Sequence, residues 1–431
     1  MKKTYIIITL LLIAVFSLNA QKPVPAVPQS EPILIKGGTA HLGDGRVIQN
    51  ALIGFSGGVI SLVDSLSGNA DLSSYKKVID AEGKHIYPGF IAPNTLLGLT
   101  EIEAVRATRD FTETGFFNPN VRSLIAYNTD SKILPTVRNN GVLIAESTPT
   151  GGWISGSSSL MQLDGWNWED AVLQPDAAIQ LRWMSETDFR AQEMKLQTGE
   201  GYNNYLSQVR GFFQEAAAYA KTKNPAVPNI RFEAMKGLYS GEQILLIHVN
   251  NAKDIITSVE LAKQSGIKRI GIVGGAESYK VTSFLKEYTI PVLIRKIHSL
   301  PYSSSEDIDM PFKLPYILKQ NGILFGFESG SEGSEVRNLP FISGTAAGYG
   351  LTFEDVVQGL TLNTAKIFGI DNRVGSLTKG KDATLFISEG NALEITGNKL
   401  TYAFIQGKKL DLRNEQTELY DRYMKKYGLD K

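Results

Sequence analysis

The middle of the chain alternates short apolar runs with longer amphipathic stretches. The apolar runs have the length of buried strands and stand at residues 141–145, 244–249, 269–273, 290–294 and 322–327. The stretches between them have helical spacing, with one apolar face formed by Ile255, Ile256, Val259 and Ala262. Continuous apolar strands separated by helices predict an α/β fold with a parallel sheet that is buried on both faces. The length of this region fits a TIM-like (β/α)8 barrel.

Both ends of the predicted barrel are flanked by β-rich sequence. Short strand-like runs between residues 33 and 63 are separated by paired glycines, as expected for hairpins. Residues 374–387 and 392–410 return to this texture, and we expect the two flanks to join into one small β-sandwich. The predicted segments are a leader (1–20), a Pro-rich linker (21–32), the first part of the sandwich (33–89), the barrel (90–370), the second part of the sandwich (371–412) and a C-terminal helix (413–431).

The first residues have the pattern of an export signal. Lys2 and Lys3 precede an apolar run from Tyr5 to Phe16, and Ala20 offers a cleavage point before Gln21. An uncleaved membrane anchor is the alternative reading, but the run is shorter than the roughly 20 residues that a helical span needs. We therefore predict a protein exported to the periplasm or the extracellular space, with no membrane span once the leader is removed.

Charge and cysteine content exclude several classes of protein. Lys and Arg together number 44, as do Asp and Glu, and this balance argues against a nucleic-acid-binding surface. The chain has no Cys, which excludes disulfides, thiolate nucleophiles and Cys-ligated metals. A Gly-x-Ser-x-Gly elbow with a placed His and Asp is also absent from the sequence, so a serine hydrolase is not indicated.

A motif near the start of the predicted barrel resembles a known family. Residues 87–99 read Tyr-Pro-Gly-Phe-Ile-Ala-Pro-Asn-Thr-Leu-Leu-Gly-Leu, which is similar to the first barrel strand of the amidohydrolase superfamily, Pro-Gly followed by two hydrophobic residues and Asp-x-His-x-His. Residues 361–369, Thr-Leu-Asn-Thr-Ala-Lys-Ile-Phe-Gly, resemble the superfamily's Thr-x-Asn-x-Ala-Lys-x-x-Gly helix. The resemblance spans about 33–410 and is closest to the branch of imidazolonepropionase and dipeptidase-type enzymes. It implies a metal-dependent hydrolase fold.

The same resemblance implies a metal site that this sequence has largely lost. The superfamily takes its metal ligands from histidines on strands 1, 5 and 6 and an aspartate on strand 8, and often bridges two metals from strand 4. The two strand-1 histidines fall here on Asn94 and Leu96. No residue can be assigned to strand 4. The other family positions fall on His248 for strand 5, Gly274 for strand 6 and Glu328 or Ser329 for strand 8.

A count of histidines supports the loss. The chain has four, and two of them, His41 and His85, fall in the predicted sandwich and its crossover. A catalytic zinc takes three protein ligands, mostly His or carboxylate. The remaining candidates, His248, His298 and Glu328, form such a set only if they converge, and we expect no metal cofactor unless they do. Otherwise His248 is either a free imidazole for polar ligands or a hydrogen-bonded residue that fills the end of the barrel.

Residues 151–159, Gly-Gly-Trp-Ile-Ser-Gly-Ser-Ser-Ser, form a Gly/Ser-rich segment after the strand at 141–145. One interpretation is a loop that presents backbone N–H groups to an anionic or carbonyl-bearing ligand. The other is a tight structural turn. Because no Walker-type Lys follows, a nucleotide site is not indicated.

The sequence therefore predicts a pseudoenzyme. We expect an exported, metal-free amidohydrolase-like barrel that acts as a binding or partner scaffold, with an active relative or a second copy as partner. The alternative is a zinc hydrolase that cleaves carbon–nitrogen bonds of a small amide, cyclic amide or dipeptide with a rebuilt site. His248 and Glu328 are its candidate catalytic residues. A third hypothesis is a ligand-binding protein with Asn94 and Glu328 as polar anchors in the old pocket.

Overall fold

The computed structural model describes residues 24–67, 71–190, 195–198, 201–223, 225–330 and 333–429. The predicted leader lies outside the described residues. Within these ranges, the helices are all too short or too polar to cross a membrane.

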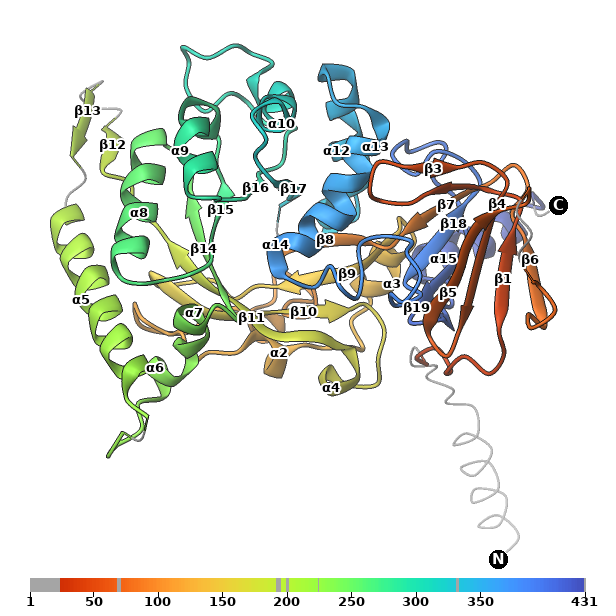
Figure 1. Cartoon of the computed structure of the whole chain (residues 1–431), viewed down its shortest axis with the longest axis horizontal. Coiled ribbons are helices and arrows are strands. Elements are labelled where there is room, and N and C mark those ends of the chain that lie inside the picture. The colour runs from red at the N-terminus through yellow and green to blue at the C-terminus, as the bar shows by residue number, and fades with distance from the viewer. Residues whose placement is uncertain are drawn as a thin grey trace, which may run out of the picture.

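A sheet curls into a nearly closed barrel at the centre of the molecule (Figure 1). In the described part of the chain it has eight strands, in the order β17 (Phe325–Phe327), β16 (Val292–Ile294), β15 (Ile270–Gly274), β14 (Ile244–Val249), β11 (Val172–Arg182), β10 (Ile154–Gln162), β9 (Val142–Ser147) and β8 (Phe90–Thr95). The prediction of a TIM-like barrel is confirmed.

The prediction of a fully parallel sheet is wrong at one strand. β10 runs antiparallel to both of its neighbours, β9 and β11, whereas the neighbouring pairs from β11 to β17 are parallel. A parallel connection needs a crossover of about a dozen residues or more. The β9–β10 connection is only residues 148–153, and the β10–β11 connection holds only the short helix α4 (Trp168–Ala171). Both links are therefore hairpin-like.

Amphipathic helices cover the outside of the barrel (Figure 1). The longer ones are α5 (Tyr202–Lys221), α8 (Ala252–Gln264) and α10 (Met310–Gln320). Ile255, Val259 and Ala262 are buried against the core, as their spacing predicted, whereas Ile256 on the edge of that face is half-buried. Complete burial of an aliphatic side chain such as Ile255 contributes about 1.5–3 kcal/mol.

Short elements fill the remaining connections. They are η1 (Arg106–Thr108), α2 (Ser123–Ala126), α3 (Ile133–Arg138), the β12–β13 hairpin (Thr187–Arg190 and Lys195–Thr198), α6 (Ile230–Ala234), α7 (Lys236–Ser240), η2 (Ser278–Val281), α9 (Thr282–Glu287), α11 (Gly333–Val336), α12 (Leu339–Gly344), η3 (Thr345–Tyr349), α13 (Phe353–Gln358), the π-helical turn η4 (Gly359–Asn363) and α14 (Thr364–Phe368). The chain closes with α15 (Glu415–Lys426), close to the helix expected from the sequence.

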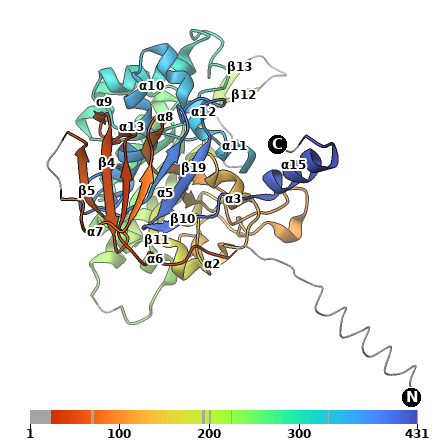
Figure 2. The ribbon, with the colours of Figure 1, turned by 90° about the vertical axis from the view of Figure 1, so that its right-hand side faces the viewer.

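Two further sheets lie beside the barrel, in red to orange and blue in Figures 1 and 2; the first uses N-terminal strands only, and the second joins strands from both ends of the chain. One sheet has the order β5 (Val59–Ser65), β4 (Ala51–Ser56), β1 (Ile33–Lys36) and β6 (Lys77–Asp80). The other has the order β20 (Lys408–Lys409), β19 (Leu400–Ile405), β18 (Leu385–Ser388), β7 (His85–Pro88), β2 (Thr39–His41) and β3 (Val47–Ile48). Their facing apolar side chains form a common core that includes Ile53, Phe55, Leu385 and Phe404.

The barrel interior contains a second core that ends below the mouth. Ile144, Leu246 and Val273 belong to this layer, which also receives Ala365 and Phe368 from α14. Because alternate residues of a strand face the same side, the next inward position on each strand lies one step nearer the mouth. Several of those positions are polar.

Candidate functional site

Strand periodicity places a set of polar side chains directly above the apolar layer. Glu146 is two residues beyond Ile144 on β9, and His248 is two residues beyond Leu246 on β14. On β11, Gln180 and Arg182 continue the inward series that begins at Ala178. Ser158 takes the equivalent place on the antiparallel strand β10, two residues before the inward Leu160, which belongs to the same layer.

Glu146 is at the centre of a buried hydrogen-bond network. Its Oε1 accepts from Ser158 Oγ at 2.5 Å and from Gln180 Nε2 at 2.8 Å. Its Oε2 accepts from the backbone N–H of Asn94 at 2.8 Å. Glu146, Ser158 and Gln180 are all 0% exposed. Burial raises the pKa of Glu146 to about 7, against the lowering effect of these three donors.

Gln180 connects this carboxyl to the histidine of strand β14. The Gln180 amide nitrogen donates to Glu146 and lies 2.7 Å from Ser158 Oγ, so its oxygen faces His248 Nε2 at 2.8 Å. An amide oxygen can only accept, which places a proton on Nε2 of the imidazole. Burial, with the positive field of Arg182 second, holds the pKa of His248 well below its ordinary value, so the ring is neutral at pH 7.

Asn94 connects the network to Glu328, at the end of strand β17. Its Nδ2 donates to Glu328 Oε2 at 2.9 Å, and its backbone has a left-handed φ of 54°. Glu328 follows β17 directly and is 8% exposed. Burial raises the pKa of Glu328 to about 7; Asn94, Arg295 and Arg182 oppose this rise, and Glu146 adds to it.

A cavity of about 330 Å³ opens beside this network at the barrel mouth. Its walls are formed by residues 94–96 at the end of β8, by Thr148, Thr150 and Gly151 after β9, and by Arg182 from β11. Leu96, at a family histidine position, is a mostly buried apolar part of the wall.

The remaining predicted site residues do not join the network. Gly274 ends β15 with φ 99°, and a Cβ there would lie 2.6 Å from Asn250 Oδ1. Ser329 is buried next to Glu328. His298 is exposed, and its Nε2 lies 2.8 Å from Thr345 Oγ1.

His41 and His85 lie in the six-stranded sheet of the sandwich, on β2 and β7. His41 Nδ1 is 2.6 Å from Glu354 Oε1, and its Nε2 is 2.9 Å from His85 Nδ1. These groups pair with one another and contribute no side chain to the cavity walls.

The interpretation of residues 151–159 as one loop is wrong. Only residues 148–153 form the connection, and the serines that follow belong to β10. They are buried because alternation turns Ser158 toward Glu146, while Ser157 donates to the Pro119 carbonyl. The backbone N–H of Thr150 is bonded to the Phe111 carbonyl, so it is not available to a ligand.

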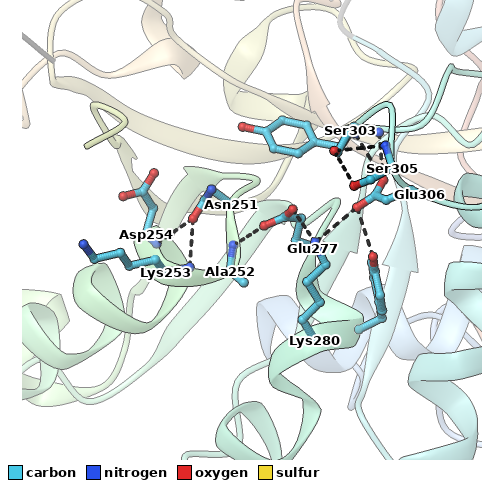
Figure 3. A network of polar contacts seen from close by, with 11 residues as sticks. Asn251, Ala252, Lys253, Asp254, Glu277, Lys280, Ser303, Ser305 and Glu306 are labelled. Atoms are coloured by element: carbon cyan, nitrogen blue, oxygen red, sulfur yellow. Dashed lines mark hydrogen bonds and ion pairs between the residues drawn. The ribbon is translucent and has the colours of Figure 1, made fainter. Parts of the chain in front are cut away.

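A second polar network fixes the loops that follow β14, β15 and β16 (Figure 3). Glu277 accepts from the backbone N–H of Ala252, at the start of α8, at 2.8 Å. Lys280 pairs with Glu277 at 2.6 Å and with Glu306 at 3.5 Å. Glu306 also accepts from the Ser303 backbone at 3.3 Å. Since these charged groups pair with one another, the network is a structural clamp on this side of the barrel mouth.

Comparison with known proteins gives a consistent family. The sequence matches the model of the amidohydrolase family over residues 213–410. A stretch of 130 residues, 30% of this chain, is 28% identical to imidazolonepropionase from Shewanella frigidimarina (strain NCIMB 400) and covers 27% of that protein's length. The crystal structure of an amidohydrolase from Thermotoga maritima MSB8 aligns with a TM-score of 0.76 at 22% identity, over 88% of this chain and 100% of that one. Residues 213–410 therefore carry the sequence pattern of the amidohydrolase family, and the described chain has the fold of a solved amidohydrolase.

A more distant amidohydrolase-superfamily structure shares the same fold. A prolidase complexed with N-methylphosphonate-L-proline aligns with a TM-score of 0.54 at 15% identity, over 88% of this chain and 99% of that one. The resemblance inferred from the motifs is confirmed by the family match over residues 213–410, which includes the motif at 361–369, and by the shared fold.

The residues at this mouth do not fit the metal that amidohydrolases carry. His248 is the imidazole of the network, and because its Nε2 donates to Gln180 it could offer a metal only the lone pair of Nδ1. Both oxygens of Glu146 already accept from protein donors, and Leu96 has no donor atom. Among the described residues, no group of three or more His, Asp or Glu side chains has an arrangement that could hold a metal ion. His248, His298 and Glu328 therefore do not assemble the rebuilt site considered from the sequence.

Four members of the network were missed by sequence reasoning, namely Glu146, Ser158, Gln180 and Arg182. A signal was present, because the stretch Ala178-Ile179-Gln180-Leu181-Arg182 alternates with period 2. That period predicts a strand with Gln180 and Arg182 on one face. A search of this strand for metal ligands passes over Gln180 and Arg182, because neither an amide nor a guanidinium is a usual metal ligand.

Proposed function

We propose that this amidohydrolase-superfamily protein is a metal-free, non-hydrolysing barrel that binds a small polar molecule at its mouth. The observation that carries the proposal is the position of Gln180 between Glu146 and His248. The Gln180 side chain donates to Glu146 and accepts from His248 Nε2, so a neutral amide separates the buried carboxyl from the imidazole.

The chemistry of the remaining groups supports the same proposal. Hydrolysis of an amide without a metal needs a reachable nucleophile with a general base beside it. Ser158 lies beside Glu146, but both side chains are fully buried and neither lines the cavity. His248 is neutral with its Nε2 hydrogen-bonded to Gln180. The cavity is nonetheless retained, with polar groups in its wall.

Export and partnership belong to the proposal as predictions from the sequence. A binding protein in the periplasm or outside the cell would meet its ligand there. Its barrel could also serve as a scaffold for an active relative or for a second copy of the chain. Cell fractionation and pull-down from native extract test these two points separately.

An activity assay tests the proposal. Purified protein is incubated with a panel of small amides, cyclic amides and dipeptides, with and without added zinc, and hydrolysis is followed by mass spectrometry. We expect product formation at the rate of buffer alone in both conditions. Hydrolysis that depends on zinc and disappears in His248→Ala, but not in the exposed matched control His298→Ala, would show that the protein is a working hydrolase.

A further inference from the structure

We infer that the cavity at the barrel mouth is an oxyanion site, in which Arg182 and Thr148 bind the carboxylate or phosphoryl group of a small molecule. The inference rests on the proposed function and names the chemical class of its ligand. It follows from two unpartnered donor groups that line the same cavity.

Arg182 supplies the positive charge. Its Nε is buried and has no hydrogen-bond acceptor among the described residues. A guanidinium presents five N–H donors in a planar fork and keeps its charge in proteins. A buried N–H without an acceptor costs free energy until a ligand provides one. The fork geometry matches the paired oxygens of a carboxylate or a phosphoryl group.

Thr148 supplies a hydroxyl from the neighbouring connection. It is the first residue after β9, its side chain is 1% exposed, and its Oγ1 has no partner within the described structure. A buried hydroxyl without a partner is uncommon in native proteins and indicates a missing hydrogen bond. Thr148, directly after β9, and Arg182, at the end of β11, line the same cavity, and the inference is that one small anion contacts both.

The protein's own carboxyls leave the charge of Arg182 only partly compensated. Glu328 is the acidic group whose field acts on Arg182, but no ion pair within 4.0 Å joins them in the described structure. One Glu328 oxygen accepts from Asn94 instead. The charged and titratable groups around Glu328 are Arg182, Arg295 and Glu146. Since burial disfavours ionisation of both acids, the guanidinium charges dominate, and an entering anion is attracted.

The dimensions of the cavity limit the rest of the ligand. Its volume of about 330 Å³ is near the lower end for small-molecule pockets, which is about 300 Å³. In the cavity wall, Leu96 contributes an apolar side chain, and Gly151 contributes backbone only. A short alkyl chain that carries one anionic group therefore fits better than a nucleotide or a peptide.

Calorimetry with matched probes tests the inference. The probes are butyrate, its neutral isostere butyramide and inorganic phosphate, titrated into the mature protein at low ionic strength. We expect butyrate or phosphate to bind at least tenfold more tightly than butyramide. Tighter binding of butyrate would indicate an organic acid, and tighter binding of phosphate would indicate a phosphate ester. Equal affinity for the charged and neutral probes, or binding of none of them, overturns the inference.

Variants assign the effect to the two donors. Arg182→Met should lower affinity for the preferred anion at least tenfold, and Thr148→Val should lower it several-fold, whereas Arg422→Met, an exposed control on α15, should leave it unchanged. Because Thr148→Val keeps the shape of the side chain, it tests the site even if Arg182→Met fails to fold. Unchanged affinity in both folded variants contradicts the inference. Amide hydrolysis by wild type would instead contradict the proposed function, so the two failures are distinguishable.

Discussion

At the scale of residues, the site is defined by substitutions that turn ligand positions into hydrogen-bonding or apolar ones. Asn94 and Leu96 fall at the places of two family histidines. His248 is bonded to Gln180, and burial, followed by the positive charge of Arg182, lowers its pKa. In this protein the carboxyl of Glu146 accepts three hydrogen bonds from protein donors, and the carboxyl of Glu328 accepts one from Asn94.

The pH dependence of stability tests the buried state of Glu328. Burial raises its pKa from 4.5 to about 7, so between these values the folded protein holds a proton that the unfolded chain has released. The free energy of unfolding must then fall as pH rises through this window, by about 3 kcal/mol for one such group. Glu328→Gln removes this titration while its amide oxygen can still accept from Asn94.

Urea unfolding at pH 5 and pH 8 measures the effect. We expect a smaller loss of stability between these two pH values in Glu328→Gln than in wild type. Part of the loss should persist, because Glu146 is raised to the same range. Glu389→Gln, at an exposed position, should follow the wild-type profile. Identical profiles for wild type and Glu328→Gln would show that this carboxyl is not buried as described.

The residue scale is also where sequence reasoning was incomplete. The motif at residues 87–99 singles out Asn94 and Leu96, which line the cavity, and Glu328 lies beside Asn94. Glu146 and Gln180 carry no family signature in this sequence. Their importance follows from mutual hydrogen bonds across β9 and β11, and pairings between distant residues cannot be read from one sequence without knowing strand register.

At the scale of elements, the connection between β9 and β10 shapes the cavity. Gly152 has φ 63°, and a Cβ there would lie 2.6 Å from the Gly115 carbonyl oxygen and 3.0 Å from that of Phe116. The backbone N–H groups of Trp153 and Ile154 both donate to the Phe116 oxygen. This contact ties the connection to the segment after β8, and it needs a residue without a side chain.

Matched glycine substitutions test this contact. Gly152→Ala combines a left-handed backbone with a steric conflict, and we expect a loss of about 1–3 kcal/mol of unfolding free energy. Gly211→Ala, in the interior of α5 with no atom within 4 Å of the added carbon, should instead stabilise by about 0.5–1 kcal/mol. Thermal unfolding of both variants shows whether their changes in unfolding free energy have opposite signs, as we expect. A neutral or stabilising Gly152→Ala would contradict the described geometry of the connection.

The antiparallel strand β10 shows a limit of pattern reading at this scale. Apolar runs predicted buried strands correctly, but strand direction depends on the length of the links between them. The short link at 148–153 carried that information. The composition of residues 151–159 left a ligand-presenting loop and a tight structural turn both open, because Gly and Ser suit a turn as well as a strand that packs closely against its neighbours.

At the scale of the whole molecule, the fold was predictable because its signals are local and repeated. The barrel follows from strand and helix periodicities, and the two terminal β segments share the six-stranded sheet β20-β19-β18-β7-β2-β3. The function was not predictable to the same degree, since one barrel supports many chemistries through a few side chains at its mouth. Here those side chains lack the arrangement of a metal centre in the described structure.

The most direct test of the account is the zinc content of the mature protein after dialysis against zinc and then against buffer. Elemental mass spectrometry gives equivalents of metal per chain for wild type, His248→Ala and His298→Ala. We predict far less than one equivalent in all three, because no three His, Asp or Glu side chains of the described residues are arranged to hold a metal ion, and Leu96 has no donor atom. Retention of one or two equivalents by wild type, lost in His248→Ala and kept in His298→Ala, would contradict the account.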